Sequence, residues 1–209
     1  MTTTIKSTIA VCGFLAAVSA PLTAGADTSV FFGKDAYGYI SGSNGNLSLQ
    51  AYSFEGATKS KSDKTNSSGA YIYGSNYTGS ECWDGYGFTD TIQFQFKKTT
   101  GSLPKQLTAS GSVLLTWVEY CTGSYPYPSF TETVTFNMDL RAMIDQAYSI
   151  WSADHSEYGN VKTNGHYDYS YAPAAAVNGS SISSPAFGTV TPSNGEIGRS
   201  KGHIVEITR

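Results

Sequence analysis

The side chains that can do chemistry in this sequence are histidines near carboxylates, acids on predicted strands, two cysteines, and aromatic rings beside glycine. The candidate metal ligands are Asp154, His155, Glu157, His166, Asp168 and His203. A zinc site needs three or four ligands that converge. The sequence holds no HExxH, no CxxC and no calcium-loop spacing. We therefore expect no metal site and no cofactor.

Carboxylates offer a second chemistry, because glycoside hydrolysis needs two acids about 5–9 Å apart. Glu119, Glu132 and Asp139 lie on or beside predicted strands, and Glu119 ends an apolar stretch close to a cysteine. No G-x-S-x-G segment provides an activated serine. A secreted hydrolase is therefore an alternative that ranks behind non-catalytic binding.

The start of the chain bears on the meaning of the cysteines. Residues 1–26 combine a short basic start, an apolar stretch and small residues at 24–26, which is the order of a secretory signal peptide. This predicts a mature chain, residues 27–209, that forms one domain and is secreted or periplasmic. Cys12 lies in the signal, so Cys82 and Cys121 remain, and an oxidising compartment permits one disulfide between them.

Both of these cysteines open segments rich in aromatic residues, CWDGYGF and CTGSYPYPSF, which we expect to be loops. A disulfide would bring the two loops side by side, so that their rings form one exposed surface, named here the aromatic shelf. Its predicted ligand-binding residues are Trp83, Asp84, Tyr86, Phe88, Tyr125 and Tyr127, with Phe130 beside them. The alternative is that Trp83 and Phe88 pack over the disulfide as part of the core.

Strands must position these residues, because hydrophobicity with a period of two dominates the sequence. TIQFQFK and TETVTFNMDL alternate between apolar and polar residues, whereas GSVLLTWVEY is apolar on both sides and predicts a central strand covered on both faces. Strands separated by Gly, Asn, Ser and Pro clusters predict an all-β antiparallel sandwich of jelly-roll or immunoglobulin-like type. The spacing within residues 140–151 leaves open a short helix or a turn with strand.

Charge and hydropathy exclude two kinds of partner. The net charge is −3 and 14% of the residues are charged, with no basic stripe that follows nucleic acid phosphates. After residue 26, no segment is apolar over the length that a transmembrane helix needs. We expect no nucleic acid partner and no transmembrane segment.

The last stretch of the chain, NGSSISSPAFGTVTPSNGEIGRSKGHIVEITR, resembles the C-terminal part of a group of uncharacterised exported bacterial β proteins. In that group a glycine-rich turn, a Thr-Pro-Ser segment and a final Lys-Gly strand close the domain. The two cysteines and the strand after Cys121 are loosely similar as well. The resemblance implies an exported bacterial all-β protein, and it carries no catalytic residue and no activity.

These observations favour an exported, non-catalytic protein that binds a polysaccharide or surface glycan, because the C–H faces of sugars stack on aromatic rings. A structural or self-associating surface protein is the alternative, since edge strands pair readily between subunits. A pore-forming toxin is a minor alternative, based on the alternating stretch near residues 91–98.

Overall fold

The computed structural model describes residues 27–60, 63–97 and 103–208; the predicted signal peptide lies outside these residues. The strands are β1 (Asp27–Asn44), β2 (Leu47–Lys59), β3 (Lys64–Tyr77), β4 (Cys82–Thr89), β5 (Ile92–Lys97), β6 (Gln106–Glu119), β7 (Ser129–Ala142), β8 (Tyr148–Tyr158), β9 (Val161–Ala176), β10 (Ser181–Ser184), β11 (Gly188–Val190) and β12 (Asn194–Thr208). One 3-10 turn, η1 (Ile144–Gln146), joins β7 to β8. Residues 140–151 are therefore a turn flanked by strands.

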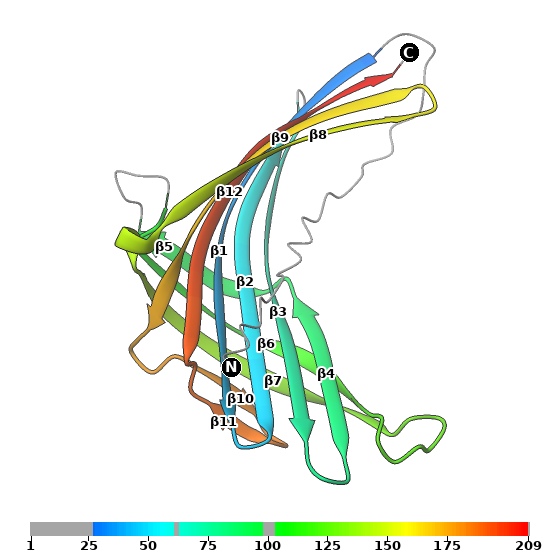
Figure 1. Cartoon of the computed structure of the whole chain (residues 1–209), viewed down its shortest axis with the longest axis vertical. Helices are drawn as coiled ribbons and strands as arrows, with labels where there is room; N and C mark the ends of the chain where they lie inside the picture. Colours follow the sequence, from blue (N-terminus) through cyan, green and yellow to red (C-terminus); the bar gives the residue numbers. More distant parts are fainter. Residues whose placement is uncertain (1–26, 61–62, 98–102, 209) are drawn as a thin grey trace, which may run out of the picture.

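The strands form one antiparallel sheet in the order β11-β10-β7-β6-β4-β3-β2-β1-β12-β9-β8, with β5 paired to β6. Two short pairings fold this sheet over: residues 83–86 with 116–119, and residues 140–142 with 174–176. The first layer consists of β4, β3, β2, β1, β12, β9 and β8. The second layer consists of β5, β6, β7, β10 and β11, and it crosses behind the first (Figure 1). The prediction of an antiparallel, sandwich-like all-β fold is confirmed.

The hydrophobic core lies between the two layers. On β7 the side chains that point into it are Val134, Phe136, Met138 and Leu140, as the period-two pattern predicts. The first layer contributes Ile40, Leu49 and Ile72, all fully buried. The hydroxyl of Ser53 on β2 lies 3.4 Å from the sulfur of Met138 on β7, which ties the layers together.

Strand β6 corrects one expectation. Val113, Leu115 and Trp117 are fully buried, whereas Leu114 between them is 63% exposed. Within the described residues, β6 therefore packs on one face only, and the expected cover on both faces is wrong. The reason is that β6 belongs to an outer layer of a two-layer fold, where alternate side chains point away from the core.

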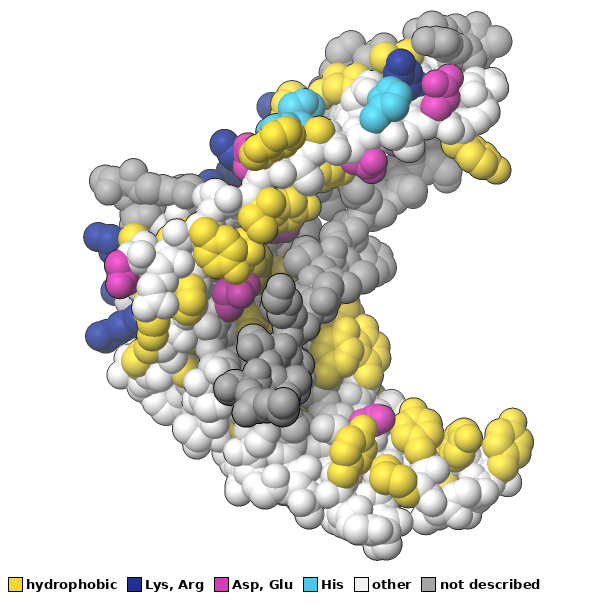
Figure 2. Space-filling model, viewed as in Figure 1, with side chains coloured by type: hydrophobic (Ala, Val, Ile, Leu, Met, Phe, Trp, Pro, Cys, Tyr) yellow, Lys and Arg dark blue, Asp and Glu magenta, His cyan; other side chains and the backbone are white. Residues whose placement is uncertain are grey.

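Beyond the core, β1, β12, β9 and β8 continue as a projecting arm (Figure 1). Every residue of β8 is exposed. The arm gives the molecule a C-shaped outline when it is viewed as in Figure 2. In the part of the chain that the structure describes, no helix has both the length and the apolar character to cross a membrane.

Candidate functional site

The predicted disulfide is present: Cys82 and Cys121 are bonded, with their Cα atoms 5.2 Å apart. Cys82 begins β4, and Cys121 follows the end of β6. The bond therefore stabilises the corner where β4 of the first layer pairs with β6 of the second layer. The prediction that both cysteines open side-by-side segments is correct, but only the segment after Cys121 is a loop.

The segment CWDGYGF is a strand, β4, so its side chains alternate between the two faces of the first layer. Trp83 points toward the second layer, where its ring lies 5.2 Å from Phe130 and 6.3 Å from Phe187. Trp83 and Phe130 are thus removed from the expected aromatic shelf, which does not form as one surface. Trp83 instead packs at the margin of the core. The alternative interpretation holds for Trp83 only in this respect and is wrong for Phe88, which is exposed on the other face of β4.

The glycines of this strand explain why a strand forms where a loop was expected. Gly74 and Gly85 are paired across β3 and β4, and the indole of Trp117 lies against both of them. A Cβ added at Gly85 would come within 2.7 Å of Trp117 Cδ2 and 2.9 Å of Leu115 Cδ2. Glycine weakens a strand in general but permits this close approach. The glycines therefore mark a site of close packing.

Asp84, Tyr86 and Phe88 point outward from β4, on the face away from the core. The rings of Tyr86 and Phe88 lie beside rings of β3. The ring centroids of Tyr86 and Tyr73 are 5.0 Å apart, and those of Phe88 and Tyr71 are 4.6 Å apart. The sequence reasoning placed these three outward residues correctly at an exposed surface. It missed the residues of β3, which form the other half of that surface.

The loop after Cys121 carries a second group of rings, named here the tyrosine loop and made of Tyr120, Tyr125 and Tyr127. The Tyr127 ring lies 5.3 Å from Tyr120 and 6.1 Å from Tyr125, and Tyr125 is 89% exposed. The backbone N–H of Tyr120 donates to the carbonyl of Cys82 at 3.0 Å, and Cys82 is paired with Tyr77 of β3. The tyrosine loop therefore adjoins the outward face of β3.

The outward rings extend across the whole first layer. None of the fifteen tyrosines is buried, and the twelve outside the tyrosine loop share one side of the sheet by register and alternation. They form the tyrosine face: Tyr37, Tyr39, Tyr52, Tyr71, Tyr73, Tyr77, Tyr86, Tyr148, Tyr158, Tyr167, Tyr169 and Tyr171. The signal in the sequence was the recurrence of tyrosine at every second position, as in AYIYGSNY and HYDYSYA.

Cross-strand rows order these rings. Tyr39, Tyr52, Tyr71 and Phe88 are successive partners on β1 to β4. Phe54 lies beside this row, and its ring centroid is 6.2 Å from that of Tyr52 and 6.1 Å from that of Tyr71. Figure 2 shows aromatic and apolar side chains gathered on the hollowed side of the molecule, beside β3 and β4 and over the loop between β6 and β7. The result is a broad aromatic surface on a rigid sheet.

Several tyrosines of this face have raised pKa values. A hydrogen bond of 2.6 Å to Asp84 raises the pKa of Tyr77. Burial, followed by the nearby Glu196 carboxylate, raises the pKa of Tyr37, which donates to Glu196 at 2.8 Å. Burial likewise raises the pKa of Tyr171 to about 12. The surface thus combines ring faces, hydroxyl donors and carboxylate acceptors.

Glu119, a candidate catalytic acid in the sequence, is a structural acceptor. It is 1% exposed. Its Oε1 accepts the backbone N–H of Cys82 at 3.2 Å and of Cys121 at 2.7 Å, and its Oε2 accepts both the hydroxyl and the backbone N–H of Thr122. These bonds, foremost that from the Thr122 side chain, hold the pKa of the carboxyl below its usual value. Glu119 therefore fastens the two ends of the disulfide.

The other two candidate acids are also held by neighbouring strands and loops. Glu132 accepts the indole N–H of Trp117 at 2.7 Å and the backbone N–H of Ala186 at 2.8 Å. Asp139 accepts the side-chain amide of Gln106 at 2.9 Å. Each of these acids thus joins β7 to another segment of the second layer.

The histidines lie on the arm. His166 and His203 are opposite one another on β9 and β12, with ring centroids 5.7 Å apart, on the side away from the tyrosine face. Oδ1 of Asp168 lies 3.3 Å from Nε2 of His166. Nδ1 of His155 is hydrogen-bonded to Oδ1 of Asn164 at 2.6 Å. Among residues 27–60, 63–97 and 103–208, no three His, Cys, Asp or Glu residues are arranged to hold a metal ion.

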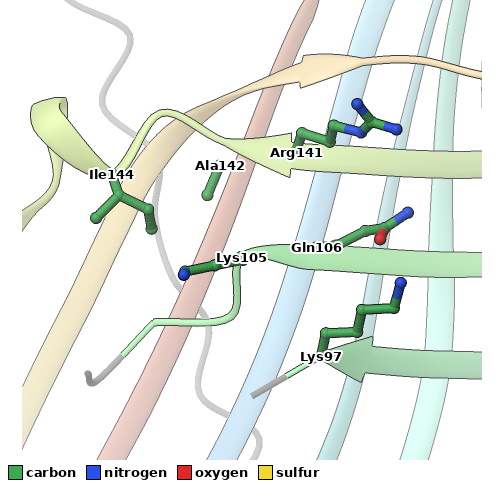
Figure 3. Close-up of a pocket in the computed structure, with 6 residues that line it drawn as sticks. All are labelled: Lys97, Lys105, Gln106, Arg141, Ala142 and Ile144. Atoms are coloured by element: carbon green, nitrogen blue, oxygen red, sulfur yellow. The ribbon is translucent and has the colours of Figure 1, made fainter. Parts of the chain in front are cut away.

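A shallow pocket lies where β5 and β7 end and β6 begins (Figure 3). It is lined by Lys97, Lys105, Gln106, Arg141, Ala142 and Ile144. Figure 3 shows Lys97 at the end of β5, Arg141 near the end of β7, and Lys105 in the segment that leads into β6. No predicted ligand-binding residue and no residue of the tyrosine face lines this pocket.

Fold and surface together define an all-β, disulfide-bonded protein with an aromatic outward face. No family model matches the chain, and no curated protein matches it.

Proposed function

We propose that the protein is exported and non-catalytic, and that the tyrosine face, together with the tyrosine loop, binds carbohydrate. The observation that carries this proposal is the outward placement of the tyrosines in rows on one side of the sheet. Large exposed aromatic patches on a folded protein mark interaction sites. The disulfide supports export, because such bonds persist in oxidising compartments.

The chemistry of the surface favours a sugar over a wholly apolar ligand. Ring faces such as those of Tyr73 and Tyr86 stack on the C–H faces of pyranoses, and tyrosine has few torsions to immobilise on binding. The carboxylate of Asp84, exposed beside these rings, accepts hydrogen bonds from sugar hydroxyls. A polysaccharide, with repeated rings, matches the repeated rings of the sheet.

The test is binding of the purified protein to a panel of insoluble polysaccharides and cell-wall fractions. Tyr86→Ala and Tyr127→Ala should each weaken binding about 2- to 12-fold, since an aromatic contact contributes about 0.5–1.5 kcal/mol. The matched control is Phe32→Ala on β1, which removes a ring that is 57% exposed on the side of the arm away from the tyrosine face. Failure to bind any polymer, or an equal loss from Phe32→Ala, would contradict the proposal.

A further inference from the structure

Strand β8 is an open edge of the sheet. It ends the strand order, and among the described residues its ladder is made with β9 alone. All eleven residues of β8 are exposed, including Ile150 at 51%, Trp151 at 69% and Tyr158 at 90%. Its far side therefore presents unpaired backbone groups together with apolar side chains.

The usual protections against edge pairing are few in this strand. Natural edges are short, bulged, or interrupted by proline. β8 has no proline, and its register with β9 runs without a bulge from Tyr148 opposite Tyr171 to Tyr158 opposite Val161. By contrast β11, at the other end of the strand order, spans three residues. The charged residues of β8 are Asp154 and Glu157, and these two acids decide which partner the edge accepts.

The sequence of β8 is complementary to itself in antiparallel orientation. When two copies of YSIWSADHSEY are centred on Ala153, all eleven residues pair. Asp154 then lies opposite Ser152, Glu157 opposite Ser149, and Tyr148 opposite Tyr158. Every acid thus faces a neutral residue. A shift by two residues that centres the pairing on Asp154 would place two carboxylates opposite each other, which is destabilising.

We propose that two copies of the protein associate through β8, pairing antiparallel about a two-fold axis at Ala153. Opposed residues of an antiparallel ladder share a face, so the two tyrosine faces lie on the same side of one continuous sheet. The interface is isologous, as two-fold symmetry requires. This pairing is independent of carbohydrate binding; the gain in avidity for a polymer, from two adjacent faces, rests on the proposed function.

Charge substitutions at Ser152 test both the pairing and its register. Ser152→Asp places a like charge opposite Asp154 at two symmetric positions, and Ser152→Lys places an opposite charge there. From the usual strength of cross-strand pairs, we expect Ser152→Asp to raise the dimer dissociation constant about 2- to 30-fold and Ser152→Lys to lower it by a similar factor. The measurement is sedimentation velocity of the purified protein from nanomolar to high micromolar concentration, with the Asp and Lys effects shrinking at about 1 M salt.

Ser156 provides the matched control. It is two residues from Asp154 on the same face, as Ser152 is, but lies opposite Ile150 in the proposed register. Ser156→Asp and Ser156→Lys should therefore shift the dissociation constant far less. A protein that is monomeric at every concentration, or equal effects at positions 152 and 156, would overturn the proposal. Because Ser152→Lys is expected to strengthen association, a folding defect cannot produce the full pattern. If the protein is a monomer but still binds polysaccharide, the dimer proposal fails and the carbohydrate proposal stands.

Discussion

Replacing Gly74 by alanine tests whether the indole of Trp117 fixes the spacing of β3 and β4. A Cβ at Gly74 would overlap Cη2 of Trp117 and would lie 2.9 Å from Leu49 Cδ2. Trp117 is fully buried, and its N–H is held by Glu132 at 2.7 Å, so the ring cannot move aside freely. Forcing an extra methyl group into such a core costs about 1–3 kcal/mol.

A smaller effect opposes this cost, because alanine reduces the freedom of the unfolded chain and so adds about 0.4–1 kcal/mol of stability where the backbone allows it. The net loss in the free energy of unfolding is then about 1–2 kcal/mol, or about 2–8 °C in Tm for a chain of this size. Urea denaturation followed by tryptophan fluorescence measures it. The control is Gly79→Ala, where a Cβ meets nothing within 4 Å, and the change should be within about 0.5 kcal/mol.

A double-mutant cycle assigns the loss to the indole. Phenylalanine at position 117 lacks the outer ring atoms that a Cβ at Gly74 would strike. In the Trp117→Phe background, Gly74→Ala should therefore cost about 1 kcal/mol less than in the wild type, within the usual range of coupling between residues in contact. Strict additivity, or a Gly74→Ala protein as stable as Gly79→Ala, would refute the reasoning.

Two further predictions concern the corner held by the disulfide. The folded pKa of Glu119 lies below its unfolded value, so its carboxylate contributes stability that is fully present above the unfolded pKa and is lost as pH falls through the folded pKa. Glu119→Gln should lower Tm at pH 7 and flatten the decline of Tm below about pH 5, and an unchanged acid limb would contradict this role. The Cys82→Ser/Cys121→Ser protein should lose about 4 kcal/mol in the free energy of unfolding, because the bond closes a separation of 39 residues; a loss under about 1 kcal/mol in guanidinium denaturation would show that the hydrogen bonds to Glu119 hold the corner without it.

The sequence predicted best those strands in which one face is apolar and the other polar. β7 alternates cleanly, and Val134, Phe136 and Met138 are buried as the pattern requires. β6 was harder, because Leu114 is as apolar as its buried neighbours and periodicity alone cannot show that its side is uncovered. That information lies in the number of layers, which depends on long-range pairing.

The candidate site was recovered in part for a related reason. Glycine and aromatic residues in CWDGYGF indicate a loop by local propensity, whereas tertiary packing against Trp117 makes it a strand. Once β4 is a strand, alternation sends Trp83 to one face and Tyr86 to the other. The partners of Tyr86 come from β3, which precedes β4 in the chain and carries no cysteine to draw attention to it.

The inward positions opposite the tyrosine face explain how a sheet can carry so many outward rings. Where Gly38 faces the core, a Cβ would lie 2.6 Å from Leu107 and 2.7 Å from Met138, so the second layer supplies the bulk that fills the core there. The same holds at Gly74 and Gly85, where Trp117 does so. At these positions the first layer therefore places a glycine against the core, while large rings occupy its outward positions. Since the core does not require the outward rings, their number and alignment are better explained by a surface that binds.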